Sequence, residues 1–243
     1  MFQHKYHTAV VDIGSPKLGN LGWCCLSTDH KTGTDLDILA KTMAKSLHSH
    51  AFVLGLEAPL FTPLRSDIML ATKGRLGEGR RPWSGGAGAQ VLSLNLPIMF
   101  YLFKAILNAF PSAKFIINAQ DFTASSGEIL IFEALVSGVD KGLSHVEDAV
   151  IMAKYCAGYA HSKKLPPTIL QEESETEYFN LATAALLRLG VDIDLKKPLT
   201  KELSDEVYQA LLVYKVVFFR DQDLTIEEHL DFGRNFGNLE IHP

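Results

Sequence analysis

The chain has 243 residues, of which 47% are hydrophobic and 21% charged, and its formal net charge is -5. This length and hydrophobic content allow one sizeable domain with a smaller appendage. The low net charge excludes a global field that would draw the protein onto nucleic acid or an anionic membrane, so any nucleic-acid contact must be local. No signal-peptide pattern opens the sequence, and an odd number of cysteines disfavours a disulfide framework, so we expect a cytoplasmic protein. The cysteines are Cys24, Cys25 and Cys156.

The first 60 residues alternate between strand-like and helix-like segments. Residues 8–13 and 21–27 are short apolar runs on either side of a turn-rich stretch, which predicts a hairpin. Apolar residues at helical spacing predict a helix over 35–50, and residues 52–56 then read as a buried strand. This alternation is typical of an α/β domain.

The middle of the chain begins with a long connection. Residues 62–90 are polar and glycine-rich and too long for an ordinary loop, so we expect either a functional or a disordered segment. The apolar run 91–110 contains polar residues and a proline and therefore predicts a buried core helix, with no membrane span. Strands are expected over 114–118 and 129–135.

The next helix is expected from Ser144 to Tyr159, where Ser144 and Glu147 have the spacing of a capping box. Residues 163–177 are rich in proline and charge and predict a surface linker, followed by a helix over 178–189. The pattern of the sequence changes after residue 190, so we predict two domains, 1–190 and 191–243.

Three carboxylates of the first domain are candidates for a functional site. Asp12 lies in the first strand, Glu57 ends the strand FVLGLE, and Asp148 lies near the start of the helix SHVEDAV. Charged side chains in such places are costly to bury unless they are paired or bind a metal. Clustered carboxylate oxygens are ligands that Mg²⁺ and Mn²⁺ prefer, and two such ions can promote phosphodiester cleavage. The alternative is structural, because acidic residues at strand ends and helix starts often cap backbone groups.

The segments VVDIG, EAP, RPWSGGAGA and HVEDAV resemble a family of predicted nucleases with a ribonuclease H-like fold, over residues 5–190. The resemblance implies a mixed sheet with flanking helices and a catalytic Mg²⁺ or Mn²⁺ site at Asp12, Glu57 and Asp148. Glu147 and Glu133 are candidates for a fourth ligand.

The loop between residues 73 and 83 is a candidate nucleic-acid contact. Its basic side chains could bind phosphates while its tryptophan stacks on a base, although basic loops are usually only solvated. His145 could assist proton transfer beside Asp148, or could simply be a capping or surface histidine. The predicted substrate-binding residues of the loop are Lys73, Arg75, Arg80, Arg81 and Trp83.

The last part of the chain reads as a small α/β fragment. A helix over 201–214, a strand over 216–220 and a helix capped by Thr225 and Glu228 are expected, with a final strand-like LEIH. The segments DLKKPL, VVFFRDQ, LTIEEHLDFGRNFG and FGNLEIHP resemble the N-terminal part of the taurine/2,4-D (TauD/TfdA) dioxygenase family, whose fold is a jelly roll. The resemblance implies that His242 contacts an acidic group of the substrate.

Dioxygenases of this family bind Fe(II) through two histidines and a carboxylate and use 2-oxoglutarate. In the family these ligands follow the HP pair, so we expect a segment cut off before its iron site and active only if a missing part is supplied. His229 and Asp231 spell HxD but fall on the predicted helix. Three readings remain: a metal-dependent nuclease-like domain fused to this segment, an incomplete dioxygenase, and a non-catalytic binding module. An isolated segment should dock on the first domain, self-associate or expose an apolar patch.

Overall fold

The structure is a computed structural model and divides into two compact units, Met1–Leu189 and Gly190–Pro243. Each unit is described by itself. The residues described are 6–27, 30–76, 78, 82–134, 141–161, 177–189, 199, 201–214, 217, 219 and 224–237.

The first unit is built on a six-stranded mixed sheet. The order of its strands is β3-β2-β1-β4-β7-β6; β1, β2 and β3 are antiparallel neighbours, whereas β1, β4, β7 and β6 run parallel. The hairpin expected at the start of the chain is present as β1 and β2. The strands are β1 (Tyr6–Asp12), β2 (Gly22–Leu26), β3 (His30–Gly33), β4 (Ala51–Leu56), β6 (Lys114–Ile116) and β7 (Glu128–Glu133).

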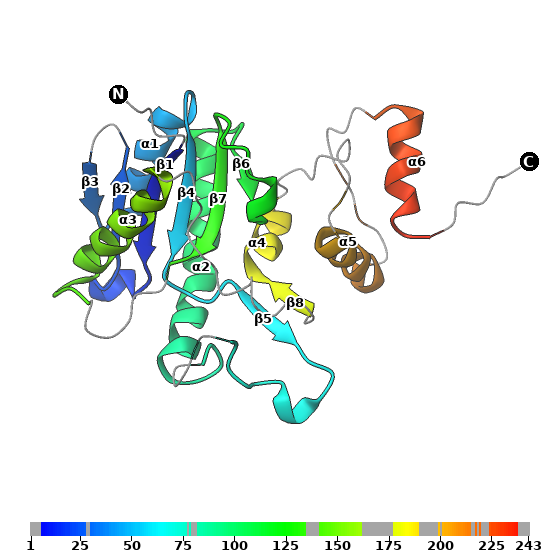
Figure 1. Ribbon diagram of the computed structural model, residues 1–243, viewed down its shortest axis with the longest axis horizontal. Helices are drawn as coiled ribbons and strands as arrows, with labels where there is room; N and C mark the ends of the chain where they lie inside the picture. The colour runs from blue at the N-terminus through cyan, green and yellow to red at the C-terminus, as the bar shows by residue number, and fades with distance from the viewer. Residues whose placement is uncertain are drawn as a thin grey trace, which may run out of the picture. The chain divides into compact units, whose positions relative to one another are not determined.

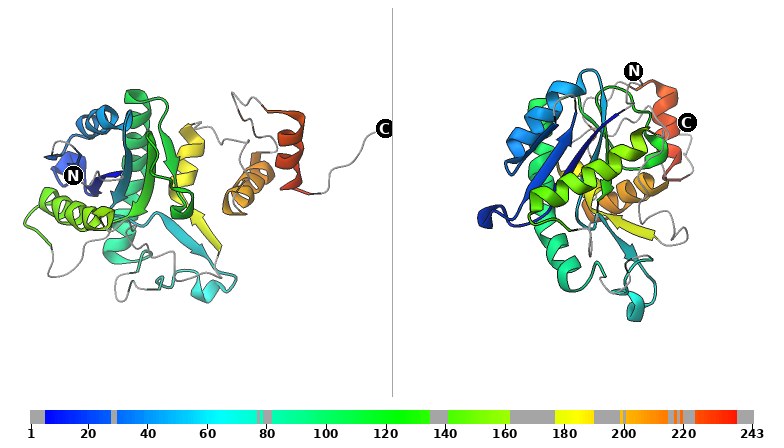
Figure 2. Two further views of the ribbon diagram at one scale, coloured as in Figure 1. Left: turned by 45° about the horizontal axis from the view of Figure 1, so that its top comes forward. Right: turned by 60° about the vertical axis from the view of Figure 1, so that its left-hand side comes forward.

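Helices cover both faces of this sheet. Helix α3 (His145–His161) lies across one face, over β1 and β2, whereas α1 (Leu36–Leu47) and α2 (Gly86–Ala109) lie on the other (Figures 1 and 2). The side chain of Asp35 caps α1 by accepting from the backbone N–H groups of Asp37 and Ile38. The result is a three-layered mixed α/β unit, as the sequence predicts at this level.

The core beneath α3 fixes which strand residues face that helix. Tyr6 and Val10 of β1, Val53 of β4 and Phe132 of β7 belong to it, together with Ala149 of α3 and several neighbours. Because successive strand residues point to opposite faces, the residue two positions beyond each of these strand residues also faces α3. The three cysteines are buried and free.

Helix α2 begins earlier than the sequence predicts and is only partly buried. Its buried face carries Ile98, Met99 and Phe103. Within its most apolar 18 residues, however, only 33% are buried. It is the one helix among the described residues that is long and apolar enough to cross a membrane by length and composition alone. The expectation of a buried core helix therefore holds for one face of α2 only, because the helix covers the sheet from outside.

A second, two-stranded sheet lies beside the main one. It pairs β5 (Phe61–Leu64) antiparallel with β8 (Glu177–Asn180), and α4 (Leu181–Leu189) follows and packs against α2. The helix expected over 178–189 thus begins later, because residues 177–180 pair as a strand. The expected linker 163–177 lies almost entirely outside the described residues.

The second unit contains two described helices, α5 (Lys201–Tyr214) and α6 (Ile226–Arg234). The bounds of α5 match the expectation. Thr225 and Glu228 form the predicted reciprocal capping box at the start of α6. The expected strand 216–220 lies mostly outside the described residues, and the expected LEIH strand lies wholly outside them.

Candidate carboxylate site

Two of the predicted carboxylates meet where neighbouring parallel strands end. Val11 of β1 pairs with Leu56 of β4, and the N–H of Glu57 donates to the carbonyl of Val11 at 2.9 Å. Asp12 has the parity of Val10, and Glu57 has the parity of Val53, so both carboxyl groups face α3. The two carboxyl groups lie close enough for each to shift the pKa of the other.

The absence of a side chain at Gly22 brings α3 to this pair. Gly22 lies opposite Asp12 in the β1–β2 register, and a Cβ atom there would lie 2.3 Å from the backbone of His145 and Val146. The first turn of α3 therefore rests directly on the sheet. His145 Nδ1 consequently lies 2.6 Å from Asp12 Oδ1.

Asp148 joins the site from the first turn of α3. Its Oδ1 accepts the backbone N–H of Gly142 at 2.6 Å, and its Oδ2 lies 3.8 Å from Lys141 Nζ. The same ammonium lies 3.8 Å from Glu57 Oε1. The structure thus brings Asp12, Glu57 and Asp148 together, with His145 and Lys141 beside them.

Burial dominates the electrostatics of these carboxyl groups. Asp12 is 1% exposed and Glu57 9%. Burial raises the pKa of Asp12 to about 6. Burial, together with the neighbouring Asp12, raises the pKa of Glu57 to about 8. The metal-free pair therefore retains a proton near neutral pH, mainly on Glu57. Asp12 Oδ2 is buried and, among the described residues, no N–H or O–H group of the protein is placed as its donor.

The donor chemistry of the site fits a hard divalent cation. Its three carboxyl groups offer only oxygen, and the buried Asp12 Oδ2 is an acceptor that a cation would satisfy. Among the residues that the structure describes, however, no three Asp, Glu, His or Cys side chains already stand in a metal-binding arrangement. In the metal-free protein the ammonium of Lys141 lies between the carboxyl groups of Glu57 and Asp148.

Arg75 and Glu133 have a different role from the predicted one. Glu133 has the opposite parity to Phe132 and so points away from α3. The guanidinium of Arg75 forms a double contact with its carboxylate, at 2.7 and 3.0 Å, and stacks 4.2 Å from the ring of Phe61. Glu78 also pairs with Arg75. Because the side chain of Arg75 is 0% exposed, it does not present its charge to a phosphate in solvent.

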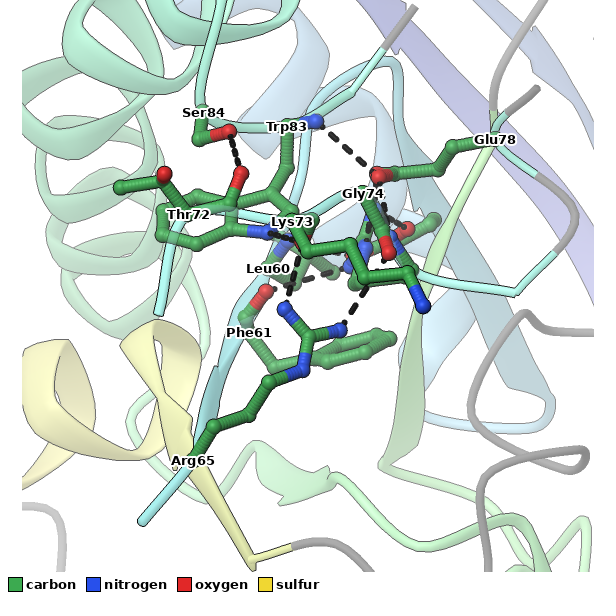
Figure 3. A network of polar contacts seen from close by, with 11 residues as sticks. Leu60, Phe61, Arg65, Thr72, Lys73, Gly74, Glu78, Trp83 and Ser84 are labelled. Atoms are coloured by element: carbon green, nitrogen blue, oxygen red, sulfur yellow. Dashed lines mark hydrogen bonds and ion pairs between the residues drawn. The ribbon is translucent and has the colours of Figure 1, made fainter. Parts of the chain in front are cut away.

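The buried pair of Arg75 and Glu133 anchors the long loop, for which the sequence allows either a functional or a disordered segment. Figure 3 shows Arg65 donating to the carbonyls of Lys73 and Gly74, and the Trp83 ring N–H donating to the carbonyl of Lys73. Trp83 is only half buried, and Lys73 is exposed. Hydrogen bonds within the first unit thus hold loop residues 73–75, 78 and 83.

The remaining predicted site residues are not part of the described cluster. The carboxylate of Glu147 accepts a hydrogen bond from the N–H of Leu143 at 2.6 Å, and the backbone N–H of Glu147 donates to Ser144 Oγ at 3.2 Å. These contacts fit the alternative in which Glu147 and Ser144 cap the start of α3. Arg80, Arg81 and His242 lie outside the described residues.

Lys141 and Gly22 shape the carboxylate cluster, and nothing in the sequence singles them out. A lysine ahead of a helix has the same local signal as any solvated lysine. A glycine in a strand signals a close approach of another backbone, but it does not tell which segment approaches.

A separate groove of about 650 Å³ lies between α2 and α4. Apolar side chains such as Leu96, Met99 and Phe179 line it, and none of the three carboxylates does. With no charged lining residue, the groove offers no chemistry to the carboxylate site.

The fold and site define the first unit as a mixed α/β unit with a buried carboxylate cluster. Comparison with known families matches residues 175–243 to the family described as Taurine catabolism dioxygenase TauD, TfdA family. The match confirms the dioxygenase-family resemblance of the C-terminal part; it begins before β8 and so includes β8 and α4, which pack within the first unit. No solved structure matches the chain.

Proposed function

We propose that the first unit binds Mg²⁺ or Mn²⁺ at Asp12, Glu57 and Asp148 and hydrolyses phosphodiester bonds in nucleic acid. The observation that carries the proposal is the buried Asp12 Oδ2, an acceptor without a protein donor, placed beside two further carboxyl groups. The ribonuclease H-like resemblance of residues 5–190 supports the same assignment, because its motifs imply a ligand at each of these three positions.

A bound divalent cation would supply a Lewis acid that polarises a phosphoryl oxygen and lowers the pKa of a bound water. The chain's own residues would orient the reaction. Asp12 holds the imidazole of His145 through Nδ1, and that side chain is 35% exposed, so it reaches from the cluster toward solvent. His145 is thereby positioned to move a proton to or from a substrate at the mouth of the site.

The test is a nuclease assay on single-stranded and branched DNA with Mn²⁺, comparing wild type with Asp12→Asn and Asp148→Asn. The proposal expects cleavage that requires the metal and falls by at least about a hundredfold in either variant, the size typical of losing one electrostatic or acid–base group. Ser84→Ala, in the folded loop, is a matched control that should cleave like wild type. Cleavage that survives both carboxylate substitutions would contradict the proposal.

A second candidate function follows from the family match at residues 175–243. We propose that this part contributes to an Fe(II)- and 2-oxoglutarate-dependent oxidation when further residues supply the iron triad. The described residues do not supply it through HxD, because His229 and Asp231 lie two apart on α6 and so point to different sides of the helix. Asp231 is instead paired with Arg234.

Anaerobic titration of the chain with Fe(II) and 2-oxoglutarate separates the two candidates. The metal-to-ligand absorption band of a bound 2-oxoglutarate complex would place iron chemistry within this chain. Its absence, together with Mn²⁺-dependent cleavage, would leave the carboxylate site as the chemistry that this chain performs alone.

A further inference from the structure

We infer that Lys141 is the resident cation of the metal-free site, and that a divalent cation must displace its ammonium group from Glu57 and Asp148 in order to bind. The inference rests on the proposed function, because it concerns the same carboxylates. It goes beyond that function by giving a role to Lys141, which is not a predicted ligand, and by requiring that its ammonium group leaves before the metal binds.

The contacts of Lys141 are those of a replaceable counter-ion. Its Nζ lies 3.8 Å from Glu57 Oε1 and 3.8 Å from Asp148 Oδ2. Both distances exceed the roughly 2.7–2.9 Å of a charge-assisted hydrogen bond, so the ammonium is shared between the carboxylates without a close bond to either. The lysine side chain is 44% exposed, whereas those of Glu57 and Asp148 are 12% and 7% exposed. The cation can therefore leave toward solvent while the carboxylates stay in place.

The backbone beside Lys141 is held firmly, which explains why its side chain reaches the site. The N–H of Gly142 donates to Asp148 Oδ1 and that of Leu143 donates to Glu147 Oε2, each at 2.6 Å. A Cβ atom at Gly142 would lie 2.5 Å from the Cβ of Glu147, so only glycine lets the chain approach the start of α3 this closely. The anchored backbone keeps the ammonium near the carboxyl groups, while 44% of the side chain remains exposed to solvent.

A divalent cation and the ammonium compete for the same oxygens. A Mg²⁺ or Mn²⁺ ion would contact carboxylate oxygens at about 2.0–2.2 Å, and an ammonium beside those oxygens would repel it at short range. Displacement resolves the conflict and turns a positive charge toward solvent at the edge of the site. A phosphate group of a substrate would meet that charge, so metal binding would both load the site and expose an anion contact.

Calorimetry with Mn²⁺ on the full chain tests the competition. Lys141→Met should bind Mn²⁺ about tenfold more tightly than wild type, the effect of removing a partly exposed ammonium group that contacts two of the ligand carboxyl groups. Lys141→Arg keeps the charge and should stay within about threefold of wild type. A second readout does not depend on any variant: mild acetylation of wild type followed by mass spectrometry should label Lys141 faster with Mn²⁺ than without it, while labelling of Lys45 on α1 stays constant.

The outcomes separate the inference from the function beneath it. Equal or weaker Mn²⁺ binding by Lys141→Met, or Lys141 labelling that Mn²⁺ leaves unchanged or slows, would overturn the displacement and leave the metal site intact. Absence of Mn²⁺ binding in both wild type and Lys141→Met would overturn the inference and the proposed metal site together. Binding seen only after Lys141→Met would support the displacement in its strongest form.

Discussion

Gly22→Ala should damage the carboxylate site although the substitution touches none of its charged residues. The new Cβ would lie 2.3 Å from the backbone of His145 and Val146, whereas ordinary contacts begin at 3.4 Å. The start of α3 must therefore move by about 1 Å, and overpacking of this kind costs about 1–3 kcal/mol. Loosening the 2.6 Å contact between His145 and Asp12 adds about 1 kcal/mol.

Gly158→Ala is the matched control on the same helix. A Cβ at Gly158 meets nothing within 4 Å, so this change should stabilise α3 by about 0.5–1 kcal/mol. Urea unfolding followed by circular dichroism measures both variants against wild type. If Gly22→Ala unfolds at the wild-type midpoint, then α3 does not rest on the sheet at Gly22 and the described geometry of the site is wrong.

Three further predictions concern the rest of the chain. Arg75→Met leaves the buried carboxylate of Glu133 unpaired and should destabilise the protein by about 3–5 kcal/mol in urea unfolding. Adding Glu133→Leu should recover most of this loss. An Arg75→Met variant with the wild-type urea midpoint would contradict the buried pair. Burial raises the pKa of Glu57 from 4.5 to about 8, so the folded state holds this proton more tightly than the unfolded state. The contribution of Glu57 to metal-free stability should be fully present below about pH 4.5 and be lost as the pH rises to about 8, by at most about 1.4 kcal/mol per pH unit; Glu57→Gln should remove this part of the pH dependence of urea unfolding, and an unchanged slope in that variant would refute the assignment. Thr225→Ala removes the cap of α6 and should speed amide hydrogen exchange in its first turn about fivefold, which corresponds to about 1 kcal/mol; unchanged exchange at Glu228 would mean that the capping box does not hold.

The carboxylate cluster could be predicted from sequence because its members follow simple periodic rules. Asp12 and Glu57 end apolar strands at the parity of the core residues, and Asp148 lies beside the buried Ala149 of α3. Glu133 is only a candidate for a fourth ligand from the sequence, because the strand EILIFE is apolar on both faces and does not show to which face this carboxylate points.

The roles of Arg75 and Lys141 could not be predicted because they depend on contacts distant in sequence. Arg75 pairs with an acid 58 residues away, and local sequence does not distinguish it from its basic neighbours in the loop. Lys141 contacts Glu57, which follows β4, although the two residues are 84 positions apart in the sequence. The strand β8 was likewise hidden in a helix-like run, since its partner β5 lies more than a hundred residues earlier.

The central claim is that Asp12, Glu57 and Asp148 form one divalent-cation site. Calorimetric titration of Mn²⁺ into wild type, Asp12→Asn and Asp148→Asn tests it most directly, with melting curves to confirm that each variant is folded. The account predicts saturable binding in wild type that both folded variants lose. No binding in wild type, or undiminished binding in the two variants, would contradict it.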